Sequence, residues 1–406
     1  MVRTIGPALL LLTTACASSM AREQQVAAAA PVLVELRANK LTEAAKAAED
    51  VLRGDASNPQ ARIVRALARY IAEAQQLFDD VRAAGVSVLL AGGRVNDRYL
   101  RQALERAEAT FAGIDRDLGV AAAAPWVELA LCVACIEGDW NRNGEIDERD
   151  KQYLEIERAA DGAPFDAGDP RRRPTFRFDV GDVHWARAMI AFQRAILSAV
   201  LAYKLDAISP GFLPRLRGPG RAEPPHFLVP LHDKAWVTRT KERILEGLDH
   251  SDAARAAYLK EIDDDREWVP SPRQKDHPLP LPVDDALYAT WAGVVSDLRK
   301  LVRGEEGIAL EDVASLSDAR VRLSGFLDLS AWFSAPKDLD LDLAELRARV
   351  EAKDDGSKLA AWFFGGALKA TMKKSALPER LRRMQSEVKR GEETFAKKLR
   401  YLFWIN

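Results

Sequence analysis

The chain has 406 residues, of which 48% are hydrophobic and 30% charged. These proportions exclude a disordered chain, because a chain stays disordered when it has too few apolar residues to bury a core. Lys and Arg number 59 against 61 Asp and Glu, which gives a formal net charge of −2. Since a generic nucleic-acid binder is basic overall, we expect no nucleic acid among the partners.

Residues 1–16 have the features of an export signal. Arg3 supplies a charge, the apolar run IGPALLLL follows, and small residues lead to Cys16. The stretch LTTAC resembles the lipobox of bacterial lipoproteins, although Thr13 stands where that family usually has Leu. The resemblance implies that Cys16 is lipidated, and Ala17 after it favours the outer membrane, facing the periplasm. An ordinary cleaved signal with an incidental cysteine is the alternative.

Helical periodicity dominates the chain after residue 30, because apolar residues recur there at spacings of three and four. The sequence therefore predicts an all-α fold, a multi-helix array or bundle with long Pro-rich loops. The best strand candidate is the short FRFDV at 176–180. Beyond residue 82, the helical runs lie near 98–112, 183–206, 236–248, 252–262, 284–303, 340–352, 357–372 and 378–403.

Two proline clusters interrupt the helical pattern, and regular helix does not tolerate such runs. We expect a tether at 17–30, a helical domain at 31–209, a Pro-rich connection at 210–235 and a second helical domain at 236–406. A single domain with long loops is the alternative.

The stretch LTEAAKAAEDVLRGDASNPQARIVRALARY, residues 41–70, resembles part of a tetratricopeptide repeat. Its small and apolar residues fall where the second helix of that repeat places them, and Asn58-Pro59 supplies the break. No second clear copy follows at the expected period of about 34 residues. The resemblance implies a helical groove for a protein partner, and a plain helical hairpin explains the pattern equally well.

Cys132 and Cys135 form CVAC within the apolar run WVELALCVACIEGDW. Positions i and i+3 of a helix share a face, so both cysteines can be small buried residues there. A disulfide is the alternative in an exported protein. The periodicity favours helical packing.

The stretch DWNRNGEIDERD, residues 139–150, places oxygen-bearing side chains at alternating positions around Gly144. It resembles the calcium-binding loop of an EF-hand, which takes ligands from positions 1, 3, 5, 7, 9 and 12 and has glycine at position 6. Ile146 occupies the eighth position, where the family keeps an apolar residue that packs the loop onto its helices. The resemblance implies six ligands: Asp139, Asn141, Asn143, the carbonyl of Glu145, Asp147 and Asp150.

The flanking sequence completes a helix–loop–helix unit. Pro125 can start a helix that enters the loop, and ERDKQYLEIERAA supplies the leaving helix. The family usually has Glu at position 12, so the shorter Asp150 puts the preference for Ca²⁺ over Mg²⁺ in doubt. A solvated polar turn is the alternative to a cation site.

Asp179, Asp182 and His184 follow one another before a long apolar helix. On a functional interpretation they are metal ligands or an acid/base cluster. The alternative is structural: Asp182 caps the helix, and His184 lies on its first turn. His226, His232 and Asp233 could complete a zinc site with His184.

These features predict a cell-envelope lipoprotein that binds calcium and has a structural or protein-binding role. The competing hypothesis is an envelope metal-dependent hydrolase that uses Asp179, Asp182 and His184, with calcium only stabilising the fold. The structure tests it by whether these side chains and residues 226–233 meet in one pocket.

Overall fold

The computed structural model describes most of the chain, with gaps between elements. The described residues are 7–38, 40–85, 96–136, 139, 143–148, 150, 155–159, 163–204, 226–262, 266–274, 283–312, 325–342 and 367–388.

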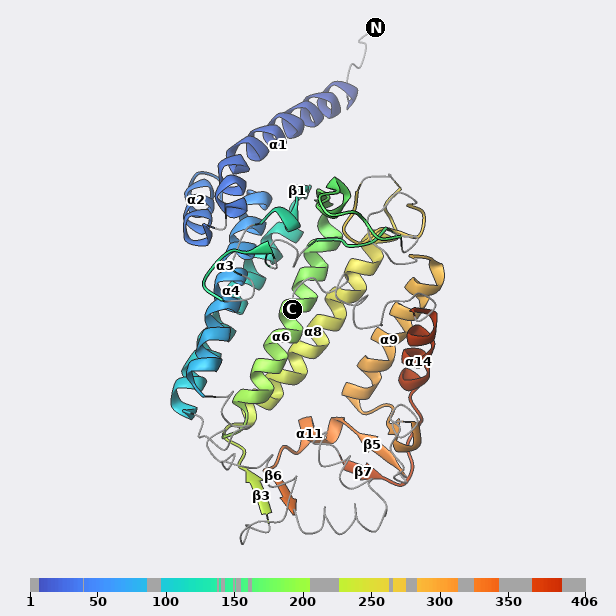
Figure 1. The fold of residues 1–406 in the computed structure, drawn as a ribbon. Helices are drawn as coiled ribbons and strands as arrows, with labels where there is room; N and C mark the ends of the chain where they lie inside the picture. Colours follow the sequence, from blue (N-terminus) through green and yellow to red (C-terminus); the bar gives the residue numbers. More distant parts are fainter. Residues whose placement is uncertain are drawn as a thin grey trace.

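Long helices make up most of the described structure, which confirms the all-α class (Figure 1). They are α1 (Pro7–Arg37), α2 (Leu41–Gly54), α3 (Pro59–Ala83), α4 (Asp97–Ala122), α6 (Val180–Leu201), α8 (Lys234–Tyr258), α9 (Asp285–Arg303) and α14 (Leu377–Val388). A short helix, α11 (Ser330–Ser334), and two 3₁₀ turns, η2 (Val133–Cys135) and η3 (Pro170–Arg172), complete the helical elements that the structure describes.

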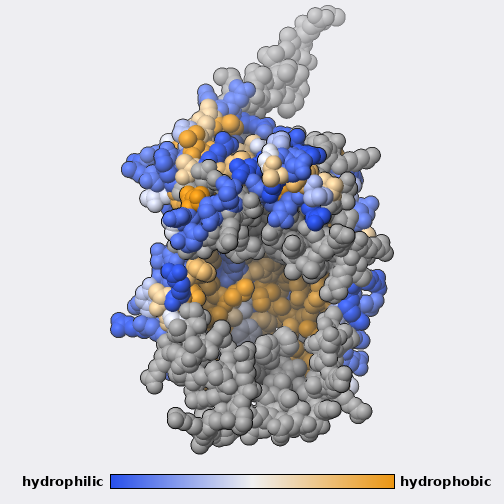
Figure 2. Space-filling model, in the orientation of Figure 1, coloured by the Kyte–Doolittle hydropathy of each residue, from blue (hydrophilic) through white to orange (hydrophobic). Residues whose placement is uncertain are grey.

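The helices form an array in which each packs on its neighbours in chain order. Contacts run from α1 to α2 and α3, then through α3–α4, α4–α6, α6–α8, α8–α9 and α9–α14 (Figure 1). Figure 2 shows apolar side chains recessed across the middle of this face, where α6 and α8 run. In the chain, α6 precedes the expected Pro-rich connection and α8 begins at its end. The two helices share an extensive interface.

Local signals explain where several helices begin and end. Asn58 caps α3 by accepting a hydrogen bond from the Ala61 N–H at 2.9 Å, and Pro59 occupies the first turn. Gly304 ends α9 with a φ of 76°, a conformation that glycine adopts without strain. Helices α2 and α3 form the helical hairpin expected at 41–70, and the tetratricopeptide resemblance stays a prediction.

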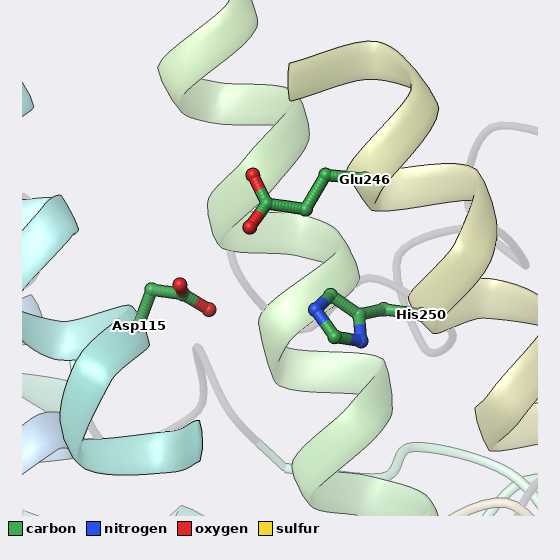
Figure 3. A group of neighbouring side chains, drawn as sticks. All are labelled: Asp115, Glu246 and His250. Carbon is green, nitrogen blue, oxygen red and sulfur yellow. The ribbon is translucent and has the colours of Figure 1, made fainter. Parts of the chain in front are cut away.

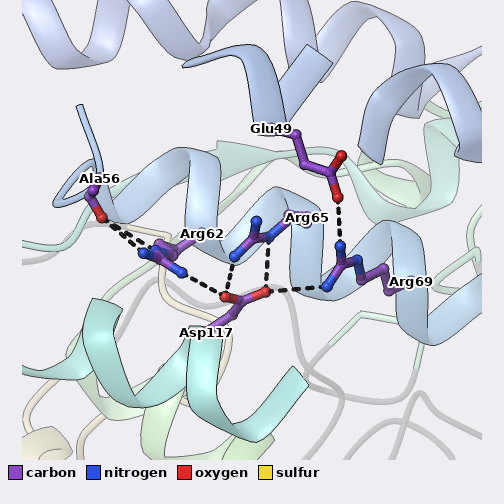
Figure 4. Close-up of polar contacts among 6 residues, drawn as sticks. All are labelled: Glu49, Ala56, Arg62, Arg65, Arg69 and Asp117. Carbon is purple, nitrogen blue, oxygen red and sulfur yellow. Dashed lines mark hydrogen bonds and ion pairs between the residues drawn. The ribbon is translucent and has the colours of Figure 1, made fainter. Parts of the chain in front are cut away.

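Buried charges join α3 to α4 (Figure 4). The Asp117 side chain on α4 accepts hydrogen bonds from Arg62 Nη1 at 2.7 Å and from Arg65 Nε at 2.8 Å. Arg69 bonds Glu49, which extends the network to α2. Because Asp117 is only 3% exposed, its charge depends on these arginines for compensation.

Helices α6 and α8 approach closely where glycine removes a side chain. A Cβ on Gly247 would lie 2.6 Å from Phe192 Cε1, and a Cβ on Gly181 would lie 2.6 Å from Tyr258 Cε1. Both distances are shorter than real carbon contacts. The two glycines therefore fix the spacing of the central helix pair.

Short antiparallel strands connect the ends of the helices. β1 (Leu129–Leu131) pairs with β2 (Phe176–Phe178), which confirms the strand candidate in FRFDV. β3 (His226–Val229) pairs with β6 (Leu339–Asp342), and β5 (Phe326–Asp328) lies between β4 (Ile308–Ala309) and β7 (Ala367–Lys369). The runs expected as helix near 340–352 and 357–372 include β6 and β7, and residues 343–366 lie outside the described structure.

The helix expected from Pro125 through the two cysteines was wrong. Strand β1 and the turn η2 occupy this segment, and Cys132 and Cys135 form a disulfide. Pairing with β2 accounts for the difference, because a non-local partner satisfies the backbone groups that a helix would have satisfied internally.

The expected tether at 17–30 lies within α1. No helix in the described part of the chain combines the length and the apolar composition needed to cross a bilayer.

Candidate metal centre

The loop at 139–150 has the sharp turn that the sequence predicts. Gly144 has a φ of 97°, which is strained for any residue with a side chain. Of the six expected ligands, Asn141 lies outside the described residues. Ile146 is 51% exposed, so the expected packing of this side chain was wrong.

The first ligand position holds the turn together. Asp139 Oδ1 accepts a hydrogen bond from the Asn143 N–H at 3.0 Å, and Oδ2 accepts one from the Gly144 N–H at 2.8 Å. Asn143 Oδ1 in turn accepts from the Glu145 N–H at 2.8 Å. These bonds wrap the backbone around the Asp139 carboxylate, as a compact oxygen-lined loop requires.

Asp147 and Asp150 bond reciprocally. Asp147 Oδ1 accepts from the Asp150 N–H at 3.3 Å, and Asp150 Oδ2 accepts from the Asp147 N–H at 3.0 Å. This reciprocity is a capping arrangement, and residues 148 and 150 are helical. Residues 155–159 are not helical, so the leaving helix expected over 148–160 was wrong there, where Arg158 instead forms a β-bridge with Pro164. Asn143 Nδ2 also donates to Asp147 Oδ2 at 3.1 Å, so ligand positions 5 and 9 lie side by side.

The loop carboxylates do not meet in one shell. Asp139, Asp147 and Asp150 do not form a group with oxygens mutually within 4.8 Å, among the residues described. An ion would therefore have to draw these side chains inward. The donor chemistry fits a hard cation, because Ca²⁺ takes carboxylate, amide and carbonyl oxygens.

Two neighbouring segments close the base of the loop. Before it, β1 pairs with β2, and the disulfide follows directly. After it, the Ile156 N–H donates to the Arg172 carbonyl at 2.9 Å, and Glu155 forms ion pairs of 2.7 Å with both Arg172 and Arg173. Both ends of the loop are thus attached to residues 172–178.

Asp179 and Asp182 cap the N-terminus of α6. Asp179 Oδ1 accepts from the Gly181 N–H at 2.6 Å, and Asp182 Oδ2 accepts from the Asp179 N–H at 2.9 Å. The residue at the N-cap is Asp179, so the sequence placed the cap three residues late. His184 is therefore the fifth residue of α6 and lies just beyond the first turn, on which the capping interpretation had placed it.

The capping acids belong to an acidic cluster that also contains Glu261 and Glu267, and of its members Asp182 and Glu267 are buried. Burial, followed by the Asp179 carboxylate, raises the pKa of Asp182 well above its usual value. Burial and the same carboxylate raise the pKa of Glu261 to about 10. With a pKa this high, Glu261 keeps its proton at neutral pH and adds no negative charge to the cluster.

The histidines do not meet at one ion. The His184 ring stacks on His250 of α8, with centroids 5.6 Å apart. The His232 N–H bonds the Ala202 carbonyl at the far end of α6. Since a helix rises 1.5 Å per residue, His184 and that end lie roughly 27 Å apart, which excludes the zinc site expected from His184, His226, His232 and Asp233.

A different group of ligand-type side chains was missed by the sequence analysis. Asp115 on α4 points toward Glu246 and His250 on α8 (Figure 3), and their ligand atoms all lie within 4.8 Å of one another. The four-residue spacing of Glu246 and His250 on one helix was a detectable signal. No sequence pattern connects this pair to Asp115.

No family model matches this sequence, and neither a curated protein nor a solved structure shows significant similarity to the chain.

Proposed function

We propose that the protein is an exported lipoprotein of the bacterial cell envelope whose loop at 139–150 binds Ca²⁺, with a structural or protein-binding role. The observation that carries the calcium proposal is the folded turn around Asp139. Both oxygens of this carboxylate hold backbone N–H groups, and Gly144 has a positive φ at the sixth position. Carboxylate and amide side chains stand at ligand positions 1, 5, 9 and 12 in the described part of the loop, which supports a cation site over a plain polar turn.

The surroundings of the loop support a structural role for the ion. Ile156, just after the loop, is fully buried in a cluster with Phe176, Tyr258 and Trp268. That cluster covers the end of α8 and the start of α6. An ion bound between the two attached ends of the loop would therefore stabilise the packing over the central helices. Mg²⁺ is the alternative ion, because the short Asp150 side chain is engaged in capping.

Several features support export. Residues 1–16 resemble a lipoprotein signal, and the Cys132–Cys135 disulfide suits an oxidising compartment. Lipid on Cys16 would place the helical array at the membrane surface, with the outer membrane and its periplasmic face as the proposed location. A partner protein would then dock on the exposed helices, and no nucleic acid is involved.

The hydrolase alternative has less support. Asp179 and Asp182 are engaged in capping α6, and His184 stacks on His250. Residues 226–233 lie at the other end of α6. The expected residues therefore do not converge, so calcium binding remains the better-supported function.

Calorimetric titration of the chelator-stripped full chain tests the calcium proposal. We expect saturable binding of Ca²⁺ near one equivalent, lost in an Asp139→Ala, Asp150→Ala double variant. Glu148→Gln is the matched control, since position 10 of the loop supplies no ligand and this side chain is exposed. Trp140 fluorescence gives a second reading. An absence of heat and of any melting shift at millimolar Ca²⁺ would contradict the proposal, because extracellular sites bind at about 10⁻⁴–10⁻³ M.

Metabolic labelling with a fatty acid tests the anchor separately. The label should enter the wild type and be absent from Cys16→Ala. Equal labelling of the two proteins would rule out an anchor on Cys16 and leave the calcium proposal intact.

A further inference from the structure

Three side chains with metal-binding chemistry converge on one side of α6. Asp115 comes from α4, whereas Glu246 and His250 come from successive turns of α8 (Figure 3). All three are half-buried, and one ligand atom from each lies within 4.8 Å of the others. The site lies near the start of α6, because His184, whose ring stacks on His250, follows the capping residue Asp182 by two positions.

Each carboxylate has one oxygen engaged and one available. Asp115 Oδ1 accepts from Arg187 Nε at 2.8 Å, and Glu246 Oε2 accepts from Arg243 Nη1 at 2.6 Å. In the described structure no hydrogen bond occupies the second oxygen of either group. Arginines in these positions orient the carboxylates, as hydrogen-bonding partners behind metal ligands commonly do.

The imidazole of His250 is prepared for coordination. A neutral imidazole carries a lone pair on one ring nitrogen, and His250 places a ring nitrogen within 4.8 Å of a carboxylate oxygen of each acid. The stacked His184 restricts the ring from one side. The Nδ1 atom of His184 is itself buried with no hydrogen-bond partner among the described residues, which places a second uncommitted imidazole beside the first.

We propose that Asp115, Glu246 and His250 bind a transition-metal ion of the Zn²⁺ type, at a site separate from the calcium loop. One nitrogen and two carboxylate oxygens form a donor set that suits Zn²⁺, whereas Ca²⁺ takes oxygen ligands only. Zn²⁺ holds such ligands at about 2.0–2.2 Å, so tetrahedral ligand atoms lie roughly 3.4 Å apart. The three ligand atoms already lie within 4.8 Å of one another, and a bound ion would draw them closer.

The ion would add a direct link between α4 and α8. Both helices pack on α6, and a bound metal would bridge them across it. Three protein ligands also leave a coordination position open, as in zinc sites that hold water or a small ligand. The competing explanation is that Arg187 and Arg243 simply neutralise the two acids, in which case no ion binds.

Zinc titration of the chelator-stripped full chain decides between these explanations. The probe is Zn²⁺ alone, followed by calorimetry and by competition with a chromophoric chelator. We expect one equivalent bound by the wild type, and at least tenfold weaker binding by His250→Gln and by Glu246→Gln. Glu242→Gln, on an exposed face of the same helix, and His232→Gln, an exposed histidine, are matched controls that should bind as the wild type does.

The Asp139→Ala, Asp150→Ala variant should retain Zn²⁺ binding, which separates this site from the calcium site. Loss of Zn²⁺ binding in that variant, equal binding by wild type and His250→Gln, or no uptake at all would overturn the proposal. Circular dichroism of the metal-free variants checks that they fold. If both ligand variants misfold, the visible absorption spectrum of Co²⁺ added to the wild type tests the site instead. Intense visible bands of a low-coordinate ion support the site, and the weak spectrum of hydrated Co²⁺ excludes it.

Discussion

The Tyr258 hydroxyl donates a hydrogen bond to Asp182 Oδ1 over 2.8 Å, and both side chains are buried. This bond joins the last residue of α8 to the first turn of α6. It also gives the buried Asp182 carboxyl a donor on each oxygen, because Oδ2 accepts from the Asp179 N–H.

Tyr258→Phe should destabilise the protein by about 1–3 kcal/mol, since it leaves a buried acceptor without its donor while keeping the ring. Denaturant unfolding measures the change. Tyr99→Phe is the control, because its hydroxyl also bonds an acid, Asp80, but its side chain is 39% exposed. Equal losses in the two variants would contradict a special role for the buried bond.

Glu261→Gln should stabilise the protein more at alkaline than at acidic pH. The pKa of Glu261 is raised to about 10 from the usual 4.5. Between these values the folded state keeps a proton that the unfolded state releases, so this group lowers stability progressively as the pH rises. Glutamine cannot titrate and removes that slope.

Melting temperatures of the wild type and Glu261→Gln, measured across this pH window, provide the test. The difference should grow with pH, and Glu242→Gln at an exposed site should show no such trend. A constant difference would mean that Glu261 ionises normally in the folded protein.

Asp117→Asn should be among the more damaging single substitutions on α4. The change leaves Arg62 and Arg65 partly buried without their shared counter-charge, which costs about 3 kcal/mol. Asp50→Asn, at the exposed ion pair with Arg53, should cost less than about 1 kcal/mol. Chemical denaturation compares them, and similar values would argue against the network in Figure 4 as a stabilising feature.

Gly247→Ala should cost about 1–3 kcal/mol, because the new methyl group meets the Phe192 ring and forces the α6–α8 interface apart. Gly113→Ala on α4 has its nearest neighbour, Arg116 Nη2, at 3.7 Å and should instead stabilise the protein by about 0.4–1 kcal/mol. Thermal melts should show a lower melting temperature for Gly247→Ala and a higher one for Gly113→Ala. Shifts in the same direction would contradict a close contact at Gly247.

Replacing Cys132 and Cys135 with serine should lower stability by about 2 kcal/mol, the chain-entropy value for so short a cross-link. The calcium affinity of the loop should fall as well, since the disulfide holds its N-terminal end. Thiol titration of the denatured, unreduced protein should find neither cysteine free. Reaction of both would show that the bond does not form.

Most helices could be predicted from the sequence because their signals are local. Asn58-Pro59 starts α3 and Gly304 ends α9, and each acts through backbone groups within a few residues. The segment around Cys132 misled the same reasoning. Its apolar spacing suits a helix, but pairing with Phe176–Phe178 depends on residues more than forty positions away in the chain.

By itself, the sequence determined the all-α class and the turn at Gly144, because helix periodicity and a glycine in a tight loop are properties of neighbouring residues. Only the tertiary structure decided which polar side chains meet. It separated His184 from His232 by most of a helix, and it brought Asp115 to His250 across α6. Such meetings depend on how helices pack, which no local pattern encodes.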